Sequence, residues 1–388
     1  MAFITAEKIH DGYKWLPEGT IIEIADDGTI IALHGAEKKD EATVYEGVLV
    51  PGFVNAHCHL ELSHMKGVIP EGLGLIPFLK HIPLHRNDFS DEQKKEARRK
   101  AYDELLNNGV VAVGDISNVN DTEDLRALDK LHIHTFVEAI GFTDVHAQKH
   151  FDNCVKVHDH FAAQKISEKI LRQSIVPHTP YTVSRALFTL IDQHKNNAII
   201  SIHNQESESE NTYYKNKQGS VPELLHLFNI DDSFFEPSVD SSLRTYADWI
   251  SPKHPMIFVH NTFTKEADIN IAQHRFPDAY WCLCPNANLY IEECLPNIDL
   301  FMKEGLNICI GTDSLSSNHQ LSILAELQTI KEHFPQLSWE TLINWATING
   351  ARALQMNDIV GSIETGKKPG IVQLCGLDNK TPMISRVF

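Results

Sequence analysis

The central part of the chain contains eight short apolar segments, and each of them ends in polar residues. In order they are GVLVPGFVNAHCH, VVAVGDIS, HTFVEAIG, SIVPHTP, IISIHNQE, MIFVHN, YWCLCPNAN and NICIGTDS. A nearly continuous apolar segment of this length is typical of a strand buried on both faces, as in a parallel sheet. The pattern therefore predicts eight parallel strands with polar side chains at their ends.

Helical patterns separate these segments. Residues 91–109 begin with acidic residues and end at a glycine, residues 184–194 begin with Ser184 as a plausible N-cap, and residues 317–335 begin with Ser317. Strand and helix alternating through eight cycles predict an α/β protein with a (β/α)8 TIM barrel. In that fold the side chains at the carboxyl ends of the strands face one common pocket.

The two ends of the chain have a different pattern. The stretch TIIEIADDGTIIALHG predicts a hairpin around residues 26–28, and IVGSIETGKKPGIVQLCGL near the C-terminus is similar in style. We therefore expect a small β-sandwich domain built from residues 1–50 and 355–388, beside a barrel domain of residues 51–354. Residues 207–250 form one long mixed segment after the fifth strand, which predicts a lid-like insertion on the pocket side.

Composition narrows the class of protein. The chain has 388 residues, of which 42% are hydrophobic, and its net charge of −18 comes from 34 basic and 52 acidic residues. An acidic chain without a basic stripe is a poor candidate for binding nucleic acid or an anionic membrane, so a small-molecule substrate is expected. Scattered cysteines, the lack of a signal-peptide pattern and the lack of a long apolar run predict a soluble cytoplasmic protein, and a homo-oligomer is compatible with all of this.

The first apolar segment ends in two histidines that flank a cysteine. His57 and His59 are two residues apart, so in a strand their side chains point the same way and Cys58 points to the opposite face. The two imidazoles can therefore reach one metal ion. In a chain with 22 histidines such a pair is weak evidence on its own.

Further ligand types end later strands. His203 ends the fifth segment, His260 the sixth and Asp313 the eighth. Imidazole and carboxylate groups suit Zn²⁺ and Fe²⁺ alike, and a bound divalent ion lowers the pKa of a water molecule to about 7. Glu206 follows His203 by three residues and is a candidate general base, the alternative being a solvated loop glutamate.

Several motifs taken together resemble one known family. The segments PGFVNAHCH, PHTPYTVS, HNQES, CLCPNANLYI, GTDSLSSN and GSIETGKKPGIVQL resemble motifs of the amidohydrolase superfamily, in its branch of purine-nucleoside and cytosine deaminases and chlorohydrolases. The resemblance implies one divalent metal ion, with Zn²⁺ preferred and Fe²⁺ as the alternative. No lysine ends the fourth segment, which argues for a single ion. The implied ligands are His57, His59, His203 and Asp313.

The resemblance also implies roles in catalysis. Glu206 would be the proton shuttle, His260 would contact the water that the metal activates, and Asp313 would help to protonate the leaving group. His178, within PHTPYTVS, would contact the substrate.

Four more residues are candidate substrate contacts. Glu61 and His64 follow the two histidines of the first segment, although they could simply begin a loop. Glu138 ends the third segment and could either bind a substrate hydroxyl or orient a ligand histidine. Asn286 occupies a position where the family often has arginine, which would alter specificity if the position contacts the substrate.

The resemblance implies a hydrolytic deaminase that releases ammonia from an aminated heteroaromatic ring. The expected substrate is a 6-aminopurine in a nucleoside-like molecule such as methylthioadenosine, S-adenosylhomocysteine or aminodeoxyfutalosine. The alternatives are hydrolysis of a cyclic amide, as in imidazolonepropionase, hydrolytic dechlorination of a triazine, and a non-catalytic binding protein. A G-x-S-x-G elbow, a dinucleotide-binding G-x-G-x-x-G and a P-loop are absent from the sequence, which argues against those enzyme classes.

Overall fold

The computed structural model describes the chain except for residues 165–167, 234, 238–239, 378 and 380–381. The strands near the two ends are β1 (Ala2–Ile9), β2 (Ile21–Ile24), β3 (Ile30–His34), β4 (Thr43–Pro51), β13 (Ile371–Cys375) and β14 (Met383–Arg386). The strands between them are β5 (Phe53–Cys58), β6 (Val110–Ser117), β7 (His132–Ala139), β8 (Leu171–Pro177), β9 (Ile200–Asn204), β10 (Met256–His260), β11 (Ala279–Leu283) and β12 (Ile308–Ile310).

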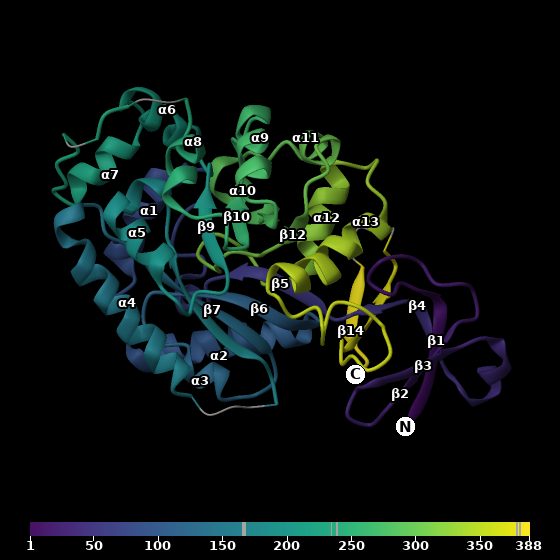
Figure 1. Ribbon diagram of the computed structural model, residues 1–388. Helices are drawn as coiled ribbons and strands as arrows, with labels where there is room; N and C mark the ends of the chain where they lie inside the picture. The colour runs from purple at the N-terminus through teal and green to yellow at the C-terminus, as the bar shows by residue number, and fades with distance from the viewer. Residues whose placement is uncertain (165–167, 234, 238–239, 378, 380–381) are drawn as a thin grey trace.

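The α-helices surround the central strands (Figure 1). They are α1 (Leu75–His85), α2 (Asp91–Asn107), α3 (Glu123–Arg126), α4 (Ala147–Ala162), α5 (Arg185–Gln193), α6 (Glu208–Asn216), α7 (Val221–Leu227), α8 (Ser242–Tyr246), α9 (Glu266–Arg275), α10 (Pro285–Glu292), α11 (Ile298–Lys303), α12 (Ile323–His333), α13 (Trp339–Asn344) and α14 (Gly350–Ala353).

The eight predicted central strands are all present and run parallel. They form two four-stranded sheets with the orders β5-β6-β7-β8 and β9-β10-β11-β12. The sheets meet at both edges: Cys58 and Asp313 form a parallel bridge, and the N–H of His203 donates to the carbonyl of His178 at 3.0 Å. The α/β class and the strand order agree with the prediction. A continuous hydrogen-bond ladder around a closed barrel is not found among the described residues.

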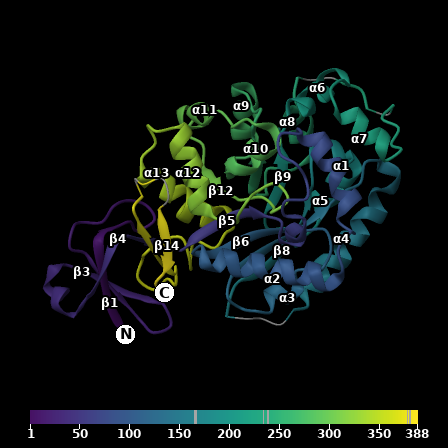
Figure 2. The ribbon, with the colours of Figure 1, turned by 180° about the vertical axis from the view of Figure 1, so that it is seen from behind.

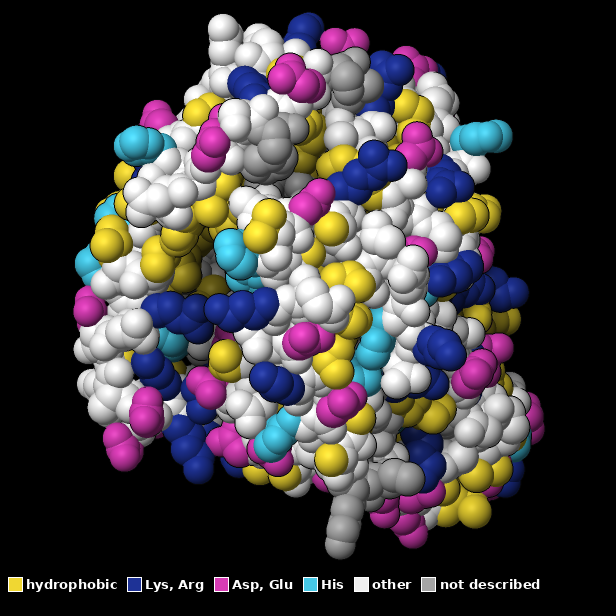
Figure 3. Space-filling model, turned by 60° about the vertical axis from the view of Figure 1, so that its left-hand side comes forward, with side chains coloured by type: hydrophobic (Ala, Val, Ile, Leu, Met, Phe, Trp, Pro, Cys, Tyr) yellow, Lys and Arg dark blue, Asp and Glu magenta, His cyan; other side chains and the backbone are white. Residues whose placement is uncertain are grey.

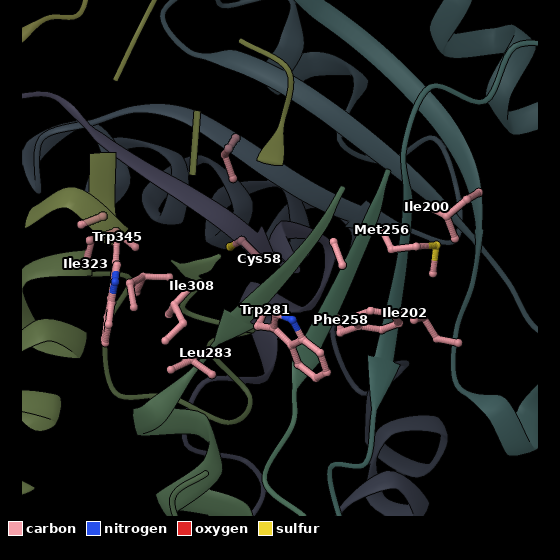
Figure 4. Packing of buried hydrophobic residues seen from close by; sticks show 14 of the residues in the cluster. Cys58, Ile200, Ile202, Met256, Phe258, Trp281, Leu283, Ile308, Ile323 and Trp345 are labelled. Carbon is pink, nitrogen blue, oxygen red and sulfur yellow. The ribbon is translucent and has the colours of Figure 1, made fainter. Parts of the chain in front are cut away.

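Burial on both faces explains why these segments form strands. Every residue of β6 and β7 is buried, as expected for parallel strands covered by helices. On the outer face, Trp281 packs against Phe258 with ring centroids 5.0 Å apart, and Cys58 belongs to the same apolar cluster (Figure 4). Cys58 therefore faces away from the two histidines that flank it, as the period of a strand requires.

Two of the three predicted helices begin where expected. Ser90 caps α2, since its hydroxyl accepts the N–H of Gln93 and the Gln93 side chain accepts the N–H of Ser90. Ser184 caps α5 by accepting the N–H of Leu187 at 3.4 Å.

The predicted start of the third helix is wrong. The helix α12 begins at Ile323 with Ser322 as its cap, so residues 317–322 are loop. Ser317 is held in this loop because its hydroxyl donates to the carboxylate of Asp313, and Asn318 because its amide donates to Glu326 and to the carbonyl of Thr312. Such local side-chain bonds compete with helix formation.

The two ends of the chain share one sheet. Its order is β14-β13-β4-β1-β2-β3, and β2 and β3 form the predicted hairpin with Ile22 opposite Leu33. Both termini lie in this part of the molecule (Figures 1 and 2). The two packed sheets of a sandwich are not found among the described residues of the ends. The alternating burial of β3 explains this, because one face of the sheet covers apolar side chains and the other faces solvent.

The predicted insertion at residues 207–250 contains the helices α6, α7 and α8, and residues 234 and 238–239 within it lie outside the described residues. The helix α7 lies beside α1 (Figure 2), and an ion pair of 2.7 Å joins Lys80 of α1 to Glu223 of α7. Its role as a lid stays a prediction. Among the described helices, none is both long and apolar enough to span a bilayer.

Replacing Trp281 by alanine tests the packing between the strands and the outer helices. The ring is 1% exposed and also packs against Phe301 at 5.6 Å, so its removal leaves a cavity that should cost about 3–5 kcal/mol of unfolding free energy. The midpoint of urea unfolding measures this. Met302→Ala, on a side chain that is 42% exposed, is the control and should change stability by less than about 0.5 kcal/mol. Equal urea midpoints for the two variants would contradict the packing of Trp281 between the strands and the outer helices.

Candidate active site

Four predicted ligands come together where the strands end. Their ligand atoms all lie within 4.8 Å of one another and are buried, and they belong to His57, His59, His203 and Asp313. The Nε2 atom of His59 is 3.2 Å from Nε2 of His57 and 3.3 Å from Nε2 of His203, and 3.4 Å from Oδ1 of Asp313. The group therefore combines residues from the ends of β5 and β9 with one that follows β12.

The donor set fits a divalent metal ion. Burial lowers the pKa of His57 and of His203 to about 4 and that of His59 to about 3, so all three imidazoles are neutral at pH 7. Neutral ring nitrogens only 3.2–3.3 Å apart need a shared cation or proton between their lone pairs. Three imidazole nitrogens and one carboxylate oxygen form a typical ligand set for Zn²⁺ or Fe²⁺.

Local backbone geometry places Asp313 in this group. Its φ of 55° lies in the left-handed region, which costs energy for a residue other than glycine. Its N–H donates to the carbonyl of His57 at 3.1 Å, and the hydroxyl of Ser317 donates to its carboxylate. At Gly311 a Cβ atom would lie 2.8 Å from the Cβ of His57, so glycine allows the close approach.

Glu206 and His260 lie beside the four ligands. Oε1 of Glu206 is 3.6 Å from Nε2 of His260, and both side chains are buried. Burial, and then the charge of Asp313, raises the pKa of Glu206 well above its usual range, so the carboxyl group can hold a proton at neutral pH. Burial lowers the pKa of His260 well below its usual range, which keeps that imidazole neutral.

A buried polar network, which the sequence did not predict, holds the backbone next to Glu206. Gln205 has a φ of 48°, and its N–H donates to the carboxylate of Glu210 at 3.1 Å. Its side chain donates to Asp268 at 3.0 Å and accepts the hydroxyl of Thr264 at 2.7 Å. The only sign of this network in the sequence is that Glu206 and Glu210 are four residues apart at the start of a helix.

These groups open into a cavity of about 300 Å³. Its inner end is polar and includes His59, His203, Glu206, His260 and Asp313. Its outer wall is mostly apolar and is formed largely by the helices α1 and α7 and by residues close to them, namely Leu75, Phe78, Leu79, Ile82, Phe142, Leu224 and Phe228. Hydrophobic side chains surround a hollow on this side of the molecule (Figure 3).

Two of the predicted substrate contacts line the cavity. His178 does so with its Nδ1 atom 2.9 Å from the hydroxyl of Thr182. Glu138 also lines it, with one carboxylate oxygen accepting the amide of Asn118 and the other 3.3 Å from Nδ1 of His203. Both expectations for Glu138, substrate binding and orientation of a ligand histidine, are compatible with this position.

Three predicted substrate contacts are not among the residues that line the cavity, and each has a partner within the protein. Glu61 accepts a backbone N–H at 3.0 Å, and His64 contacts a backbone carbonyl at 3.2 Å. The side-chain oxygen of Asn286 accepts the hydroxyl of Thr329, a residue of α12, at 2.6 Å.

Other lining residues were not predicted. They include Arg86, Asn118, Thr179, Ser314 and Ser316. The two serines lie within GTDSLSSN, so the motif was a signal for them, and Thr179 lies within PHTPYTVS. Arg86 and Asn118 follow a helix and a strand without any recognisable motif.

Comparisons with known proteins agree on one family. The Amidohydrolase family matches residues 48–385. An adenosine deaminase of Helicobacter pylori is 26% identical over 377 residues, which is 95% of this chain and 88% of that protein.

Two solved structures have the same fold. The aminofutalosine deaminase of Helicobacter pylori in complex with methylthio-coformycin has a TM-score of 0.84 at 22% identity, covering 96% of this chain and 91% of that chain. An adenosine deaminase from Xanthomonas campestris with bound zinc has a TM-score of 0.73 at 21% identity, covering 96% and 84%. With the family matched over residues 48–385 and its expected ligand types gathered at the strand ends, the chain belongs to the Amidohydrolase family.

Proposed function

We propose that this protein is a metal-dependent hydrolytic deaminase that releases ammonia from the 6-aminopurine ring of a nucleoside-like molecule. The observation that carries the proposal is the pair Glu206 and His260, 3.6 Å apart beside four buried metal-ligand side chains at the inner end of the cavity. The similarity over 95% of the chain to an adenosine deaminase supports this choice among the reactions of the family.

His57, His59, His203 and Asp313 would hold one divalent ion. Both Zn²⁺ and Fe²⁺ accept a set of three imidazoles and one carboxylate. Zn²⁺ is our first choice because the similar adenosine deaminase from Xanthomonas campestris has bound zinc, and Fe²⁺ is the alternative. When bound, such an ion lowers the pKa of a water molecule to about 7 and so supplies a nucleophile at neutral pH.

The side chains of this chain then move the protons. The carboxylate of Glu206 accepts a proton from the water whose oxygen attacks the ring carbon that bears the amino group, and delivers it to the adjacent ring nitrogen. His260 is neutral, so its Nε2–H can donate to the attacking oxygen and orient it. When the carbon–nitrogen bond breaks, Asp313 passes the remaining hydroxyl proton to the leaving amine, and ammonia departs.

The residues that would bind the substrate are assigned from their positions in the cavity. His178 lines the inner part of the cavity and would contact the purine ring, and Glu138 would accept a hydroxyl of the sugar. The apolar outer wall excludes water from the remaining part of the cavity, which strengthens the polar interactions at its inner end.

Metal content tests the ligand set. We expect about one zinc or iron ion per chain in purified protein by elemental analysis, and His203→Ala or Asp313→Ala should lower this to less than about one tenth. Added Zn²⁺ should raise the melting temperature of the metal-free wild-type protein, because the ion binds only the folded state. His64→Ala is the control and should keep its metal, since His64 lies outside the ligand group. Undiminished metal in the Asp313 variant would refute the ligand set.

Ammonia release from a panel of aminopurine nucleosides tests the reaction. Glu206→Gln should lower kcat by about 10²–10⁴-fold while metal content stays the same, because the amide cannot take a proton from water. Glu208→Gln, two residues further on at an exposed position of α6, should retain activity. Full activity in Glu206→Gln would contradict the role of Glu206. Release of chloride, or a ring-opened product without ammonia, would move the protein to another reaction of the family.

The network around Gln205 is tested at Glu210. Glu210→Ala removes the acceptor of the Gln205 N–H and should lower kcat by about 10²-fold through displacement of Glu206, with little change in KM. Glu210→Gln keeps an oxygen acceptor and should retain more of the activity. Metal content should be unchanged in both variants, whereas a purely structural loss would lower metal content and kcat together. Glu208→Ala is the matched control.

A further inference from the structure

Two histidines lie one turn apart on α1, outside the site described above. His81 and His85 are separated by four residues, so their side chains are neighbours on the helix surface. Their rings are parallel to within 13°, with centroids 5.5 Å apart. Neither residue lines the cavity, although Phe78 and Ile82 of the same helix do. The pair is therefore separate from the four buried ligand side chains.

The hydrogen bonds of this pair leave ring nitrogens available to a ligand. Nδ1 of His85 is 2.9 Å from Oδ2 of Asp88, so a neutral His85 donates from Nδ1 and keeps the lone pair on Nε2. Metal-binding histidines usually have such a carboxylate behind them, because it fixes the tautomer and makes the other nitrogen more basic. Nδ1 of His81 is buried without a hydrogen-bond partner among the described residues, so that ring is not committed to another group.

The chemistry of the pair favours a divalent transition-metal ion. Imidazole nitrogen suits Zn²⁺, Cu²⁺ and Ni²⁺, whereas Mg²⁺ and Ca²⁺ prefer oxygen ligands. The side chain of His85 is 38% exposed, so water can complete the coordination of an ion. The charge of the neighbouring Lys80 is balanced by its ion pair with Glu223 at 2.7 Å, and the net charge of −18 attracts cations to the protein. Two protein ligands bind more weakly than four, so this position fills only after the buried one.

We propose that His81 and His85 form a second metal site, which binds a divalent transition-metal ion and fastens the last turn of α1. Pro83 lies between the two histidines and has no N–H to donate to the carbonyl four residues earlier, so the helix is weakened at this turn. An ion held by both rings spans the weak turn. Because α1 forms much of the outer wall of the cavity, the ion stabilises that wall without contacting the substrate.

Another pair of histidines has the same spacing without this geometry. His146 and His150 are also four residues apart, but His146 precedes α4 as its N-cap, and its Nδ1 is 3.2 Å from the hydroxyl of Thr143. The helix therefore does not present these two rings side by side, and His150 provides a matched control.

Calorimetric titration of the full-length protein with Zn²⁺ tests the second site. After the buried ligand group has been loaded with Zn²⁺, the wild type should bind about one further equivalent. His81→Ala and His85→Ala should each abolish this second step. Asp88→Asn should weaken it by about 10-fold, because the carboxylate behind His85 is lost. His150→Ala should keep it, and all four variants should keep the first equivalent.

Hydrogen exchange in α1 locates the second ion independently of activity. The N–H of Arg86 donates to the carbonyl of Ile82 at 3.0 Å and so closes the last turn of the helix. In the loaded wild type, further Zn²⁺ should slow the exchange of this N–H by about 10-fold, because the ion stabilises the closed turn. In His85→Ala the same addition should leave the exchange unchanged.

The outcomes separate this proposal from its competitors. A second step that persists in both His81→Ala and His85→Ala, or that is lost in His150→Ala, would overturn the proposal, because zinc would then bind elsewhere. A loaded wild type that binds no further zinc would overturn it as well, and would leave the proposed deaminase intact. Should the buried ligand group fail to bind zinc, the proposed function loses its ligand set, and the dependence of the remaining zinc on His81 and His85 still decides the second site.

Discussion

The close contact between β5 and the residues that follow β12 is the constraint on which the site depends. The carbonyl of His57 accepts the N–H groups of both Thr312 and Asp313, at 3.0 and 3.1 Å. This contact joins the first and last strands of the two parallel sheets and brings a carboxylate from position 313 to histidines at positions 57 and 59. It is possible because Gly311 has no side chain to fill the narrow space beside His57.

The backbone around the site is strained at several strand ends and is held by hydrogen bonds. Gln205, His260 and Asp313 all have positive φ angles at strand ends, between 48° and 70°. Residues other than glycine keep such angles only where surrounding bonds hold them, and they concentrate at functional sites. Here the carboxylates of Glu210 and Asp268 hold Gln205, and Ser317 binds Asp313. The polar groups behind the cavity thus fix the geometry of those that face it.

The strands could be predicted from short-range periodicity, whereas the choice of His57, His59, His203 and Asp313 as the ligand group came from the resemblance to the amidohydrolase superfamily. An apolar segment that ends in histidine or aspartate places that side chain at the carboxyl end of a parallel strand, and all such ends meet at one side of the fold. The start of α12 could not be predicted, because it depends on the bond between Ser317 and Asp313, which forms only in the fold. The position of Asn286 could not be predicted either, because it depends on a contact with Thr329, which is distant in sequence. The two ends form a single sheet, and this likewise depends on which face of the sheet is exposed to solvent.

The cavity separates chemistry from selectivity. The groups at its inner end come from strand ends, where register fixes each side chain to within one residue, and their pattern is readable in the sequence. The outer wall comes largely from α1 and α7. The residues of these helices have no fixed register with the strands. Contacts such as the ion pair between Lys80 and Glu223 position them instead. Relatives can therefore share the inner groups and differ in substrate. A side chain on this wall that lies outside every motif can change what is bound without altering the reaction, which is why the specificity of this chain has to be derived from its structure.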